Sequence, residues 1–504
     1  MFYTWLLQER RTEMESIWRK TETTSRKRKS LAGEIHTDAA VIGGGLSGIL
    51  TAWFLQSRGV DTIVLEAETI GSGQTENTSA KITSQHNLIY DKLIKTVGTE
   101  QAGGYAKASQ QAIEDYETII RQKKIDCFFE RKPAYLYTRK NDSMKEALER
   151  EVRAAERLGI PALFTERPKQ EPDLPFSITG AVRFDRQAQF HPLLFLNALA
   201  EELTIYEHTR VRSVEKNCLV TDQGKVRAEH VIFAGHYPFL LRPGYYFIRM
   251  YQERSYCLAL EGPKPLEAMY LGADPDGLSF RSFQNQMILG GGKHRTGENP
   301  YGNKYAMLEQ KAKEFWPQCK YTACWSAQDC MTLDGIPYIG QFSSNRPNWY
   351  VATGFGKWGM TNAMVSARLI SDAVLGKDMG EWKVFSPQRI NLTGSASCLI
   401  KNTVQASKGL GKRLFMRPKN ALDKLEAGHG GIVTVQGKKV GAYKEENGKI
   451  YLVSVTCPHL GCQLEWNPDE KTWDCPCHGS RFTYQGELLN GPAENGVDTY
   501  HELC

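Results

Sequence analysis

The spacing of apolar and polar positions divides the chain into segments of different type. Between residues 36 and 385, short apolar runs of β type alternate with segments of helical period, which is typical of an α/β protein. The run Ala39–Ile42 leads into three consecutive glycines and then a longer apolar segment. This order predicts a strand, a tight turn and a helix at the start of an α/β domain.

The regions outside this segment follow other patterns. Residues 1–35 are polar and basic with little core-forming pattern, and they predict an N-terminal arm. Residues 386–414 contain few large apolar side chains and many Ser, Gly, Asn and Lys, which predicts a flexible linker. From 415 to 504, short apolar runs are separated by turn sequences such as QGK and ENGK. This last pattern predicts a small antiparallel β domain.

Composition and charge exclude several classes of protein. A chain of 504 residues is long enough for two or three domains, and 41% hydrophobic with 24% charged residues is typical of a globular protein. The net charge of +6 is modest, and the basic run Arg26–Lys29 is better explained as a solvated surface than as a nucleic-acid site. Residues 39–57 are uncharged, but their glycines favour a nucleotide-binding unit over a membrane span. We therefore expect no transmembrane segment and no nucleic-acid partner.

Cysteine usage and the N-terminus indicate the compartment. Six of the twelve cysteines are scattered without the spacing of a disulfide framework, as in proteins of a reducing compartment. The first residues lack the charged and apolar regions of a signal peptide. The sequence thus predicts a cytoplasmic protein.

The glycine-rich segment has the spacing of a dinucleotide site. Gly43, Gly45 and Gly48 form G-x-G-x-x-G directly after a predicted strand. The first glycine permits a tight turn, the second lets the backbone approach a pyrophosphate, and the third lets the helix pack closely on the strand. Eighteen residues after Gly48, a second predicted strand ends at Glu66, an acid suited to a ribose hydroxyl. The motif by itself fits both FAD and NAD.

Later segments bear on the choice between these cofactors. Residues 71–86 (GSGQTENTSAKITSQH) follow the second strand, and HVIFAG, DGIPYIG and GFGKWG come further along the chain. In this order, residues 36–385 resemble the D-amino-acid oxidase family of FAD-dependent oxidoreductases. The resemblance implies a Rossmann-type FAD-binding domain with an inserted antiparallel-sheet substrate subdomain. It also implies oxidation of a C–N bond in an amine or amino acid.

The resemblance also assigns roles to individual residues. The ADP half of FAD would be bound by Gly43, Gly45, Gly48 and Glu66, with adenine against the backbone of Val211. Thr78, Ser79 and Lys81 would lie along the flavin ring or the phosphates. Gly354, Gly356 and Lys357 would lie near the pyrimidine edge of the flavin, where a cation stabilises the reduced ring. The polar candidates for the substrate, each more readily explained by a structural role, are Arg281, His294, Arg295 and Tyr338.

A second motif lies in the C-terminal domain. Cys457 and His459 are followed by Cys475 and His478, with one further cysteine in each half. Zinc fingers usually pair cysteine with cysteine and histidine with histidine, whereas each half here combines one of each. This pattern fits a [2Fe–2S] cluster bound by two thiolates and two imidazoles.

Residues 415–504 resemble the Rieske proteins through these two halves. The resemblance implies that Cys457 and Cys475 bind one iron, and that His459 and His478 bind the other. It also implies a disulfide between Cys462 and Cys477, as in the respiratory type of Rieske protein.

The combination of the two domains predicts a redox enzyme. We expect a flavin-dependent dehydrogenase in which electrons pass one at a time to the cluster and then to an external acceptor protein or quinone. Three alternatives remain open at this point. The chain could be an oxidase that uses O₂, a reductase that serves a partner enzyme, or an electron carrier or redox sensor without a substrate. The only later G-x-G-x-x-G, at Gly354, Gly356 and Gly359, is the segment assigned above to the flavin edge, which leaves none for a nicotinamide and disfavours the reductase.

Overall fold

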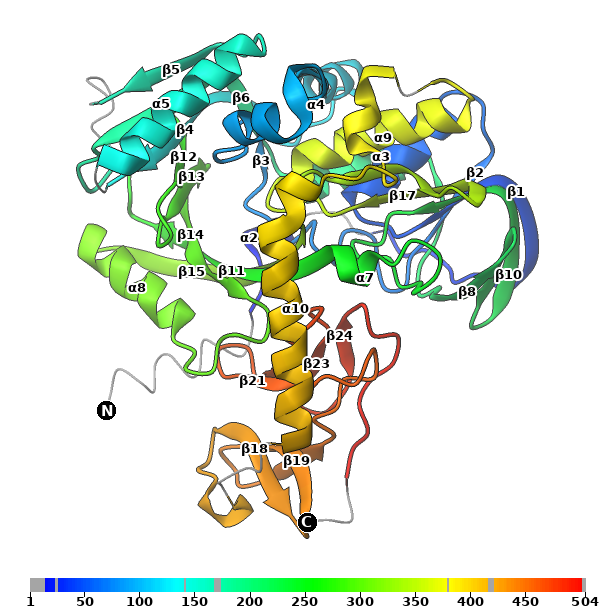
Figure 1. Cartoon of the computed structure of the whole chain (residues 1–504), viewed down its shortest axis with the longest axis vertical. Helices are drawn as coiled ribbons and strands as arrows, with labels where there is room; N and C mark the ends of the chain where they lie inside the picture. Colours follow the sequence, from blue (N-terminus) through cyan, green and yellow to red (C-terminus); the bar gives the residue numbers. More distant parts are fainter. Residues whose placement is uncertain are drawn as a thin grey trace.

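The structure is a computed structural model that describes residues 14–22, 26–139, 142–166, 174–378, 380–415 and 421–500. A large domain contains two sheets side by side, with helices packed around them (Figure 1). A small β domain lies below it in the view of Figure 1, and the long helix α10 runs between the two. We call residues 14–385 the large domain and residues 421–500 the small domain. No helix in the described ranges has the length and apolarity needed to cross a bilayer.

The first sheet is built around the predicted strand–turn–helix unit. Its strand β1 pairs in parallel with β2 on one side and with β10 on the other. Helices α3 (Leu46–Gln56) and α9 (Gly359–Val374) pack together over this sheet. In spatial order its main strands are β16 (Tyr338–Ser343), β17 (Arg346–Thr353), β10 (Gly224–Phe233), β1 (Gly33–Ile42), β2 (Thr62–Leu65) and β7 (Thr204–Tyr206). The hairpin of β8 (Val211–Glu215) and β9 (Cys218–Thr221) extends β10.

The second sheet is mostly antiparallel and is the inserted subdomain that the sequence led us to expect. Its edge strand β15 (Lys320–Thr332) pairs along its length with β11 (Met250–Glu261). The remaining strands, in order, are β14 (Gln286–Arg295), β13 (Ser279–Phe283), β12 (Met269–Gly272), β4 (Glu130–Thr138), β6 (Gly180–Gln189) and β3 (Lys81–Ile82), with β5 (Ala162–Thr165) beside β6. Its helices include α4 (Tyr90–Lys123), α5 (Asp142–Arg157) and α8 (Lys304–Phe315).

The small domain consists of two antiparallel sheets. One contains β18 (Gly430–Val435), β19 (Lys438–Lys444) and β20 (Ile450–Val453). The other contains β21 (Glu465–Asn467), β22 (Thr472–Asp474), β23 (Arg481–Thr483) and β24 (Leu488–Asn490). The loops that carry the cysteine and histidine motif connect these short strands.

Part of the predicted N-terminal arm, residues 14–22, is packed into the large domain. Ser16 caps the short helix α2 (Ile17–Lys20), and Trp18 on that helix is fully buried. The Trp18 ring contacts His191 and Phe283 edge to face. The prediction of an arm is therefore wrong for these residues, because one large aromatic side chain anchors a segment whose average composition is polar. Residues 1–13 lie outside the described ranges.

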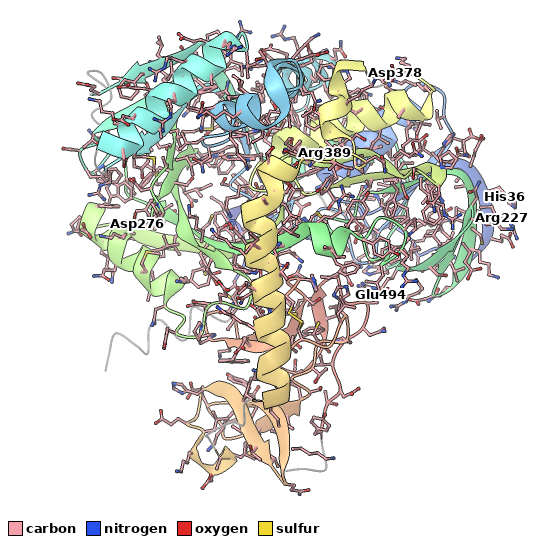
Figure 2. All side chains as sticks on the ribbon, in the orientation of Figure 1. His36, Arg227, Asp276, Asp378, Arg389 and Glu494 are labelled. Carbon is pink, nitrogen blue, oxygen red and sulfur yellow. A yellow bond between two sulfur atoms is a disulfide. The ribbon has the colours of Figure 1, made fainter. Side chains whose placement is uncertain are left out.

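The predicted flexible linker contains a helix instead. Helix α10 (Leu392–Phe415) occupies most of residues 386–414. Ser and Gly have low intrinsic helix propensity, but contacts with the rest of the protein outweigh this preference. Just before the helix, Arg389 (Figure 2) forms two hydrogen bonds of 2.8 and 2.9 Å with the buried carboxylate of Asp334. Near its other end, Gly409 packs against the sulfur atoms of the small domain.

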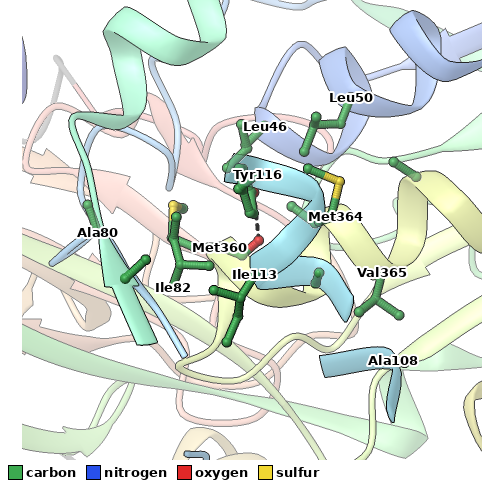
Figure 3. Close-up of a cluster of buried hydrophobic side chains, with 14 of the residues drawn as sticks. Leu46, Leu50, Ala80, Ile82, Ala108, Ile113, Tyr116, Met360, Met364 and Val365 are labelled. Atoms are coloured by element: carbon green, nitrogen blue, oxygen red, sulfur yellow. Dashed lines mark hydrogen bonds between the residues drawn. The ribbon is translucent and has the colours of Figure 1, made fainter. Parts of the chain in front are cut away.

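The main core of the large domain joins its helices to the loop before β3. Figure 3 shows side chains from α3, α4 and α9 in contact with Ala80 and Ile82. The phenol of Tyr116 on α4 donates a hydrogen bond of 2.8 Å to the carbonyl of Met360 on α9. This core therefore fixes the segment around Thr78, Ser79 and Lys81, which are predicted to lie beside the cofactor.

Candidate functional site

The glycine turn after β1 has the close packing that its motif predicts. Gly43 has a φ of +112°, and a Cβ at this position would lie 2.8 Å from the Cα of Gly235. A Cβ on Gly48 would lie 1.9 Å from the carbonyl oxygen of Gly43. Gly45 is the N-cap of α3. The turn thus leaves bare backbone and a helix N-terminus at one place, an arrangement that fits a pyrophosphate.

Glu66 lies beside this turn at the end of β2. Its carboxylate accepts hydrogen bonds of 2.6 Å from the N–H of Gly44 and 2.9 Å from that of Glu68, and burial raises its pKa. The segment leading to Val211 is adjacent, because the N–H of Thr209 donates to the carbonyl of Glu66 at 2.8 Å. The two residues expected at the adenosine half of the cofactor are therefore brought together from distant parts of the sequence.

A buried arginine and a buried tryptophan hold the backbone of residues 78–80 in place. The Arg281 guanidinium donates to the carbonyls of Ser79 (2.8 Å) and Ala80 (2.7 Å). Burial lowers the pKa of Arg281 to about 9. The carbonyl of Thr78 accepts a hydrogen bond of 2.7 Å from the indole N–H of Trp18. Arg281, a candidate substrate residue, thus supports the loop on which Thr78 and Ser79 lie.

Lys81 has a supporting position of the same kind. Its ammonium donates to the carbonyl of Tyr270 at 2.8 Å and to the hydroxyl of Ser279 at 2.6 Å. Burial lowers its pKa to about 7. Its polar contacts therefore go to strands β12 and β13 of the second sheet.

The loop after β17 brings a cation against two carboxylates. Gly354 and Gly356 have φ values of +73° and +55°, and a Cβ on Gly354 would lie 2.3 Å from the side chain of Thr332. The Lys357 ammonium lies 2.8 Å from Asp329 on β15 and 3.4 Å from Glu253 on β11. Burial opposes the charge on Lys357, but the two carboxylates outweigh it and raise the pKa. Lys357 is therefore protonated and shared by two acids.

In the small domain, four cysteines lie in one buried cluster. Cys462 and Cys477 form a disulfide, and the sulfur of Cys475 lies within 4.8 Å of both. Cys457 is also buried. Sulfurs in a disulfide cannot act as thiolate ligands, so Cys457 and Cys475 remain as candidates.

The two motif histidines lie together next to these cysteines. The rings of His459 and His478 are 4.9 Å apart between centroids. Within the described residues, both ring nitrogens of His459 and Nδ1 of His478 are buried without a hydrogen-bond partner. Burial lowers the pKa of His459 to about 4 and that of His478 to about 3, so both are neutral at pH 7. Two buried thiols with two neutral imidazoles are the donor set of a Rieske cluster.

Strands β11 and β15 separate the two sites. Side chains alternate between the faces of a strand. On one face, Gln252 donates to the carbonyls of His478 (2.8 Å) and Gly491 (3.0 Å), and Gln328 donates to that of Gly479 (2.8 Å). The next residues along, Glu253 and Asp329, bind Lys357 on the other face, and Figure 1 shows the small domain below β11.

A buried charge network also fixes the small domain against this sheet. Glu470 of the small domain contacts Arg254 of β11 and Ser326 of β15, and it lies 3.1 Å from Arg481. Burial alone would raise the pKa of Glu470, but Arg254 and Arg481 lower it to about 2. Two cations therefore compensate the charge of this buried carboxylate.

The other three substrate candidates lie at different places. The His294 ring stacks on Tyr256, on the side of the sheet that faces Glu470. Arg295 donates to the carbonyls of Pro476 and Cys477, both at 3.1 Å. The Tyr338 ring lies between the guanidinium groups of two arginines. The structure therefore does not gather the four candidates into one site.

Several residues of the site carry no recognisable signal in the sequence. Gln252, Glu253, Gln328 and Asp329 acquire their positions only because β11 pairs with β15 across more than 60 intervening residues. Phe247, which contacts both motif histidines, lies on a helix of four residues. Only a prediction of the strand pairing could have identified the first four.

The fold and the two sites define an FAD-dependent oxidoreductase that carries a Rieske [2Fe–2S] domain. The chain belongs to this family: residues 38–373 match the family described as FAD dependent oxidoreductase, and residues 419–501 match the Rieske [2Fe-2S] domain. The resemblances, the fold class and the cofactors, FAD and a [2Fe–2S] cluster, are thereby confirmed. The bare glycine turn fits FAD, and the unpartnered histidine nitrogens fit the cluster.

Individual proteins are similar to the whole chain or to its large domain. The Putative Rieske 2Fe-2S iron-sulfur protein YhfW of Bacillus subtilis (strain 168) is 36% identical over 497 residues, which cover 95% of this chain and 96% of that protein. Gamma-glutamylputrescine oxidoreductase of Escherichia coli (strain K12) is 24% identical over 382 residues, covering 69% and 85%. Glycine oxidase from Geobacillus kaustophilus shares the fold, with a TM-score of 0.60 and 20% identity over 70% of this chain and 99% of its own.

Proposed function

We propose that the protein is a dehydrogenase that oxidises a C–N bond of an amine or amino acid and passes the electrons through the cluster to an external acceptor. FAD supplies the two-electron oxidation of the substrate, and the [2Fe–2S] centre supplies one-electron transfer. The names of similar proteins support this substrate class, since they include a gamma-glutamylputrescine oxidoreductase, a glycine oxidase and an L-amino acid deaminase.

The observation that carries the proposed electron route is the two-strand wall formed by β11 and β15. Gln252 and Gln328 bind the backbone of the cluster loops on one face. Glu253 and Asp329, each the next residue in its strand, bind Lys357 on the opposite face beside Gly356. The predicted flavin edge and the predicted cluster ligands are therefore supported by adjacent residues of the same strands, which favours transfer within the docked molecule.

The chain's own groups have supporting roles in this proposal. Lys357 stays protonated between Asp329 and Glu253, which hold its ammonium group at the predicted flavin edge. Arg281 fixes the carbonyls of Ser79 and Ala80. The domain limits at residues 36, 386 and 415 and the cytoplasmic location remain part of the proposal.

An anaerobic mixing experiment tests the function. The holoprotein would be mixed with a panel of primary and secondary amines and amino acids, and flavin absorbance and the EPR signal of the reduced cluster would be followed together. A Cys475→Ser variant serves as the control, because it removes a predicted cluster ligand and leaves the large domain unchanged. We expect one compound to bleach the flavin in both proteins and to produce the cluster signal only in the unaltered one.

Other results would contradict the proposal. If NAD(P)H reduces both the flavin and the cluster and no amine bleaches the flavin, the protein is a reductase. If the Cys475→Ser variant turns over with O₂ as fast as the unaltered protein, the protein is an oxidase and the cluster does not accept electrons from the flavin.

A further inference from the structure

A pocket of about 860 Å³ lies on the surface of the large domain, where the segment around α7 (Tyr246–Arg249) and β16 meets the chain leading into α10. Arg389, labelled near the upper end of α10 in Figure 2, lines one side. This volume is in the range of sites for organic ligands. None of the roles assigned above to FAD or to the cluster uses this pocket.

Helix α7 separates this pocket from the predicted cluster ligands. Phe247 lies edge to face against His459 and His478, at centroid distances of 5.8 and 5.7 Å. Its neighbours Tyr245, Ile248 and Arg249 line the pocket. A ligand in the pocket would therefore be separated from the histidine rings by the thickness of one short helix.

The pocket is positively charged. Arg242, Arg249 and Arg346 line it, and within the described ranges none of the three forms an ion pair with a carboxylate. The fourth arginine, Arg389, is neutralised by its ion pair with Asp334. The unbalanced arginines favour a ligand with an acidic group, because a guanidinium binds carboxylate, sulfonate and phosphate groups with two parallel hydrogen bonds.

The pocket also offers apolar surface. This surface does not come from Tyr338, which is 5% exposed and whose ring lies 4.2 and 4.1 Å from the guanidinium carbons of Arg249 and Arg389. Ile248 and Ile390, which also line the pocket, are 51% and 84% exposed. Large aliphatic side chains left in water around a cationic pocket favour a ligand that combines an apolar body with its acidic group. A lining guanidinium such as that of Arg249 favours a planar body, because guanidinium groups stack on aromatic rings.

We propose that this pocket binds the external electron acceptor, and that the acceptor is a planar aromatic compound of quinone type with an acidic substituent. The inference rests on the proposed function, in which electrons leave by way of the cluster. A quinone bound there takes two electrons, delivered in two single transfers, together with two protons from solvent, and becomes the hydroquinone. The cluster is oxidised once in each transfer, so electrons and protons balance.

The test starts from chemically reduced holoprotein, so its result does not depend on the amine substrate. After stoichiometric reduction with dithionite, the protein would be mixed with 1,4-naphthoquinone-2-sulfonate or with menadione, a neutral quinone with the same ring system. Loss of the reduced-cluster EPR signal would be followed by rapid freezing. Binding of the sulfonate to the oxidised holoprotein would be measured by equilibrium dialysis.

Two alterations probe the pocket in different ways. The double variant Arg242→Gln/Arg346→Gln removes two cations, and Ile248→Trp fills space beside α7. Arg153→Gln, at an exposed arginine of α5 that does not line the pocket, is the matched control. We expect saturable reoxidation and one binding site for the sulfonate, with Kd raised about tenfold or more in the double variant. Ile248→Trp should weaken the binding of both quinones, and the control variant should weaken the binding of neither.

The proposal fails if the reoxidation rate rises linearly with the sulfonate concentration and Ile248→Trp leaves it unchanged. It also fails if the control weakens binding as much as the double variant, because the effect would then reflect overall charge. If dialysis detects no binding, the pocket does not bind a small quinone, and an acidic protein becomes the candidate partner for this surface. None of these results decides whether the protein oxidises an amine, because the anaerobic mixing experiment tests that function separately.

Discussion

Unpartnered polar atoms and close backbone contacts around single residues indicate where this protein binds its cofactors. The histidines of the small domain are buried, neutral and without hydrogen-bond partners among the described residues, which a stable core tolerates only when another group satisfies them. At the glycine turn, a single methyl group would collide with backbone. Both features can be tested with single substitutions.

Replacement of Gly48 by alanine should abolish FAD binding. The added Cβ would lie 1.9 Å from the Gly43 carbonyl and would push α3 away from the turn, at a cost of about 1–3 kcal/mol. The measurement is the ratio of flavin to protein absorbance after purification, together with Tm. Gly103→Ala is the control, because a Cβ at that helical position meets nothing within 4 Å. A flavin-replete Gly48→Ala protein would contradict the assignment.

Glu470 should contribute to stability in a pH-dependent way. Its pKa of about 2 in the folded protein lies below the ordinary value of 4.5, so its stabilisation is complete above pH 4.5 and is lost as pH falls toward 2. From this shift, we expect about 2 kcal/mol of the free energy of unfolding to be lost between pH 6 and pH 3. Urea unfolding at both pH values would show this component in the unaltered protein and not in Glu470→Gln. An equal loss in both proteins would exclude Glu470 as its source.

At the scale of elements, α10 shows how a segment of weak helical propensity becomes a rigid connection. Gly409 packs against Cys477 in the small domain, and Arg295 of β14 donates a hydrogen bond of 2.5 Å to Asn402 in the middle of the helix. The helix is therefore tied to the large domain and to the disulfide at once. Such contacts disfavour the freely swinging small domain that a flexible linker would allow.

Two glycines of α10 provide a matched test of this connection. A Cβ on Gly409 would lie 2.8 Å from the Cys477 sulfur, whereas a Cβ on Gly411 would meet nothing within 4 Å. We expect Gly409→Ala to destabilise the protein by about 1–3 kcal/mol and to speed hydrogen exchange in the helix. Gly411→Ala should stabilise by up to about 1 kcal/mol, because alanine favours helix over glycine. Equal effects of the two substitutions would show that α10 does not pack on the disulfide.

At the scale of the whole molecule, the paired strands β11 and β15 join the two domains. Their alternating side chains bind the small domain on one face and Lys357 on the other. The buried network of Arg254, Glu470 and Arg481 adds a contact that breaks only at high cost, because it would leave charges unpaired away from water. The two predicted redox sites are therefore held at a fixed separation.

Loss of the two glutamines should slow electron transfer between the domains without affecting the first step. Gln252→Ala/Gln328→Ala removes three hydrogen bonds to the cluster loops, each worth about 1 kcal/mol, which should lower the equilibrium constant for docking about tenfold or more. In anaerobic stopped-flow experiments, flavin bleaching should keep its rate while the cluster signal appears more slowly. Gln286→Ala, on β14 and bonded to Thr322, is the control. If the cluster is reduced at an unchanged rate, electrons do not pass from the flavin to the cluster across β11 and β15.

The sequence by itself determined the local motifs. The glycines at 43, 45 and 48 and the cysteine–histidine pairs predicted both cofactor classes, because their chemistry depends on residue type and short spacing. The alternation of strands and helices predicted the α/β domain and the small β domain for the same reason. Composition failed for residues 14–22 and for α10, where one buried tryptophan and one packed glycine outweigh the average polarity.

Only the tertiary structure decided how the two centres are connected. The pairing of β11 with β15, the buried partners of Arg281 and Lys81, and the sharing of Lys357 by two acids all join residues far apart along the chain. Such contacts depend on which faces of distant strands meet, and no spacing in the sequence encodes that choice. The sequence therefore determined which cofactors the protein binds. Packing between distant segments decided how the two cofactor sites are placed and which polar side chains support the surrounding backbone.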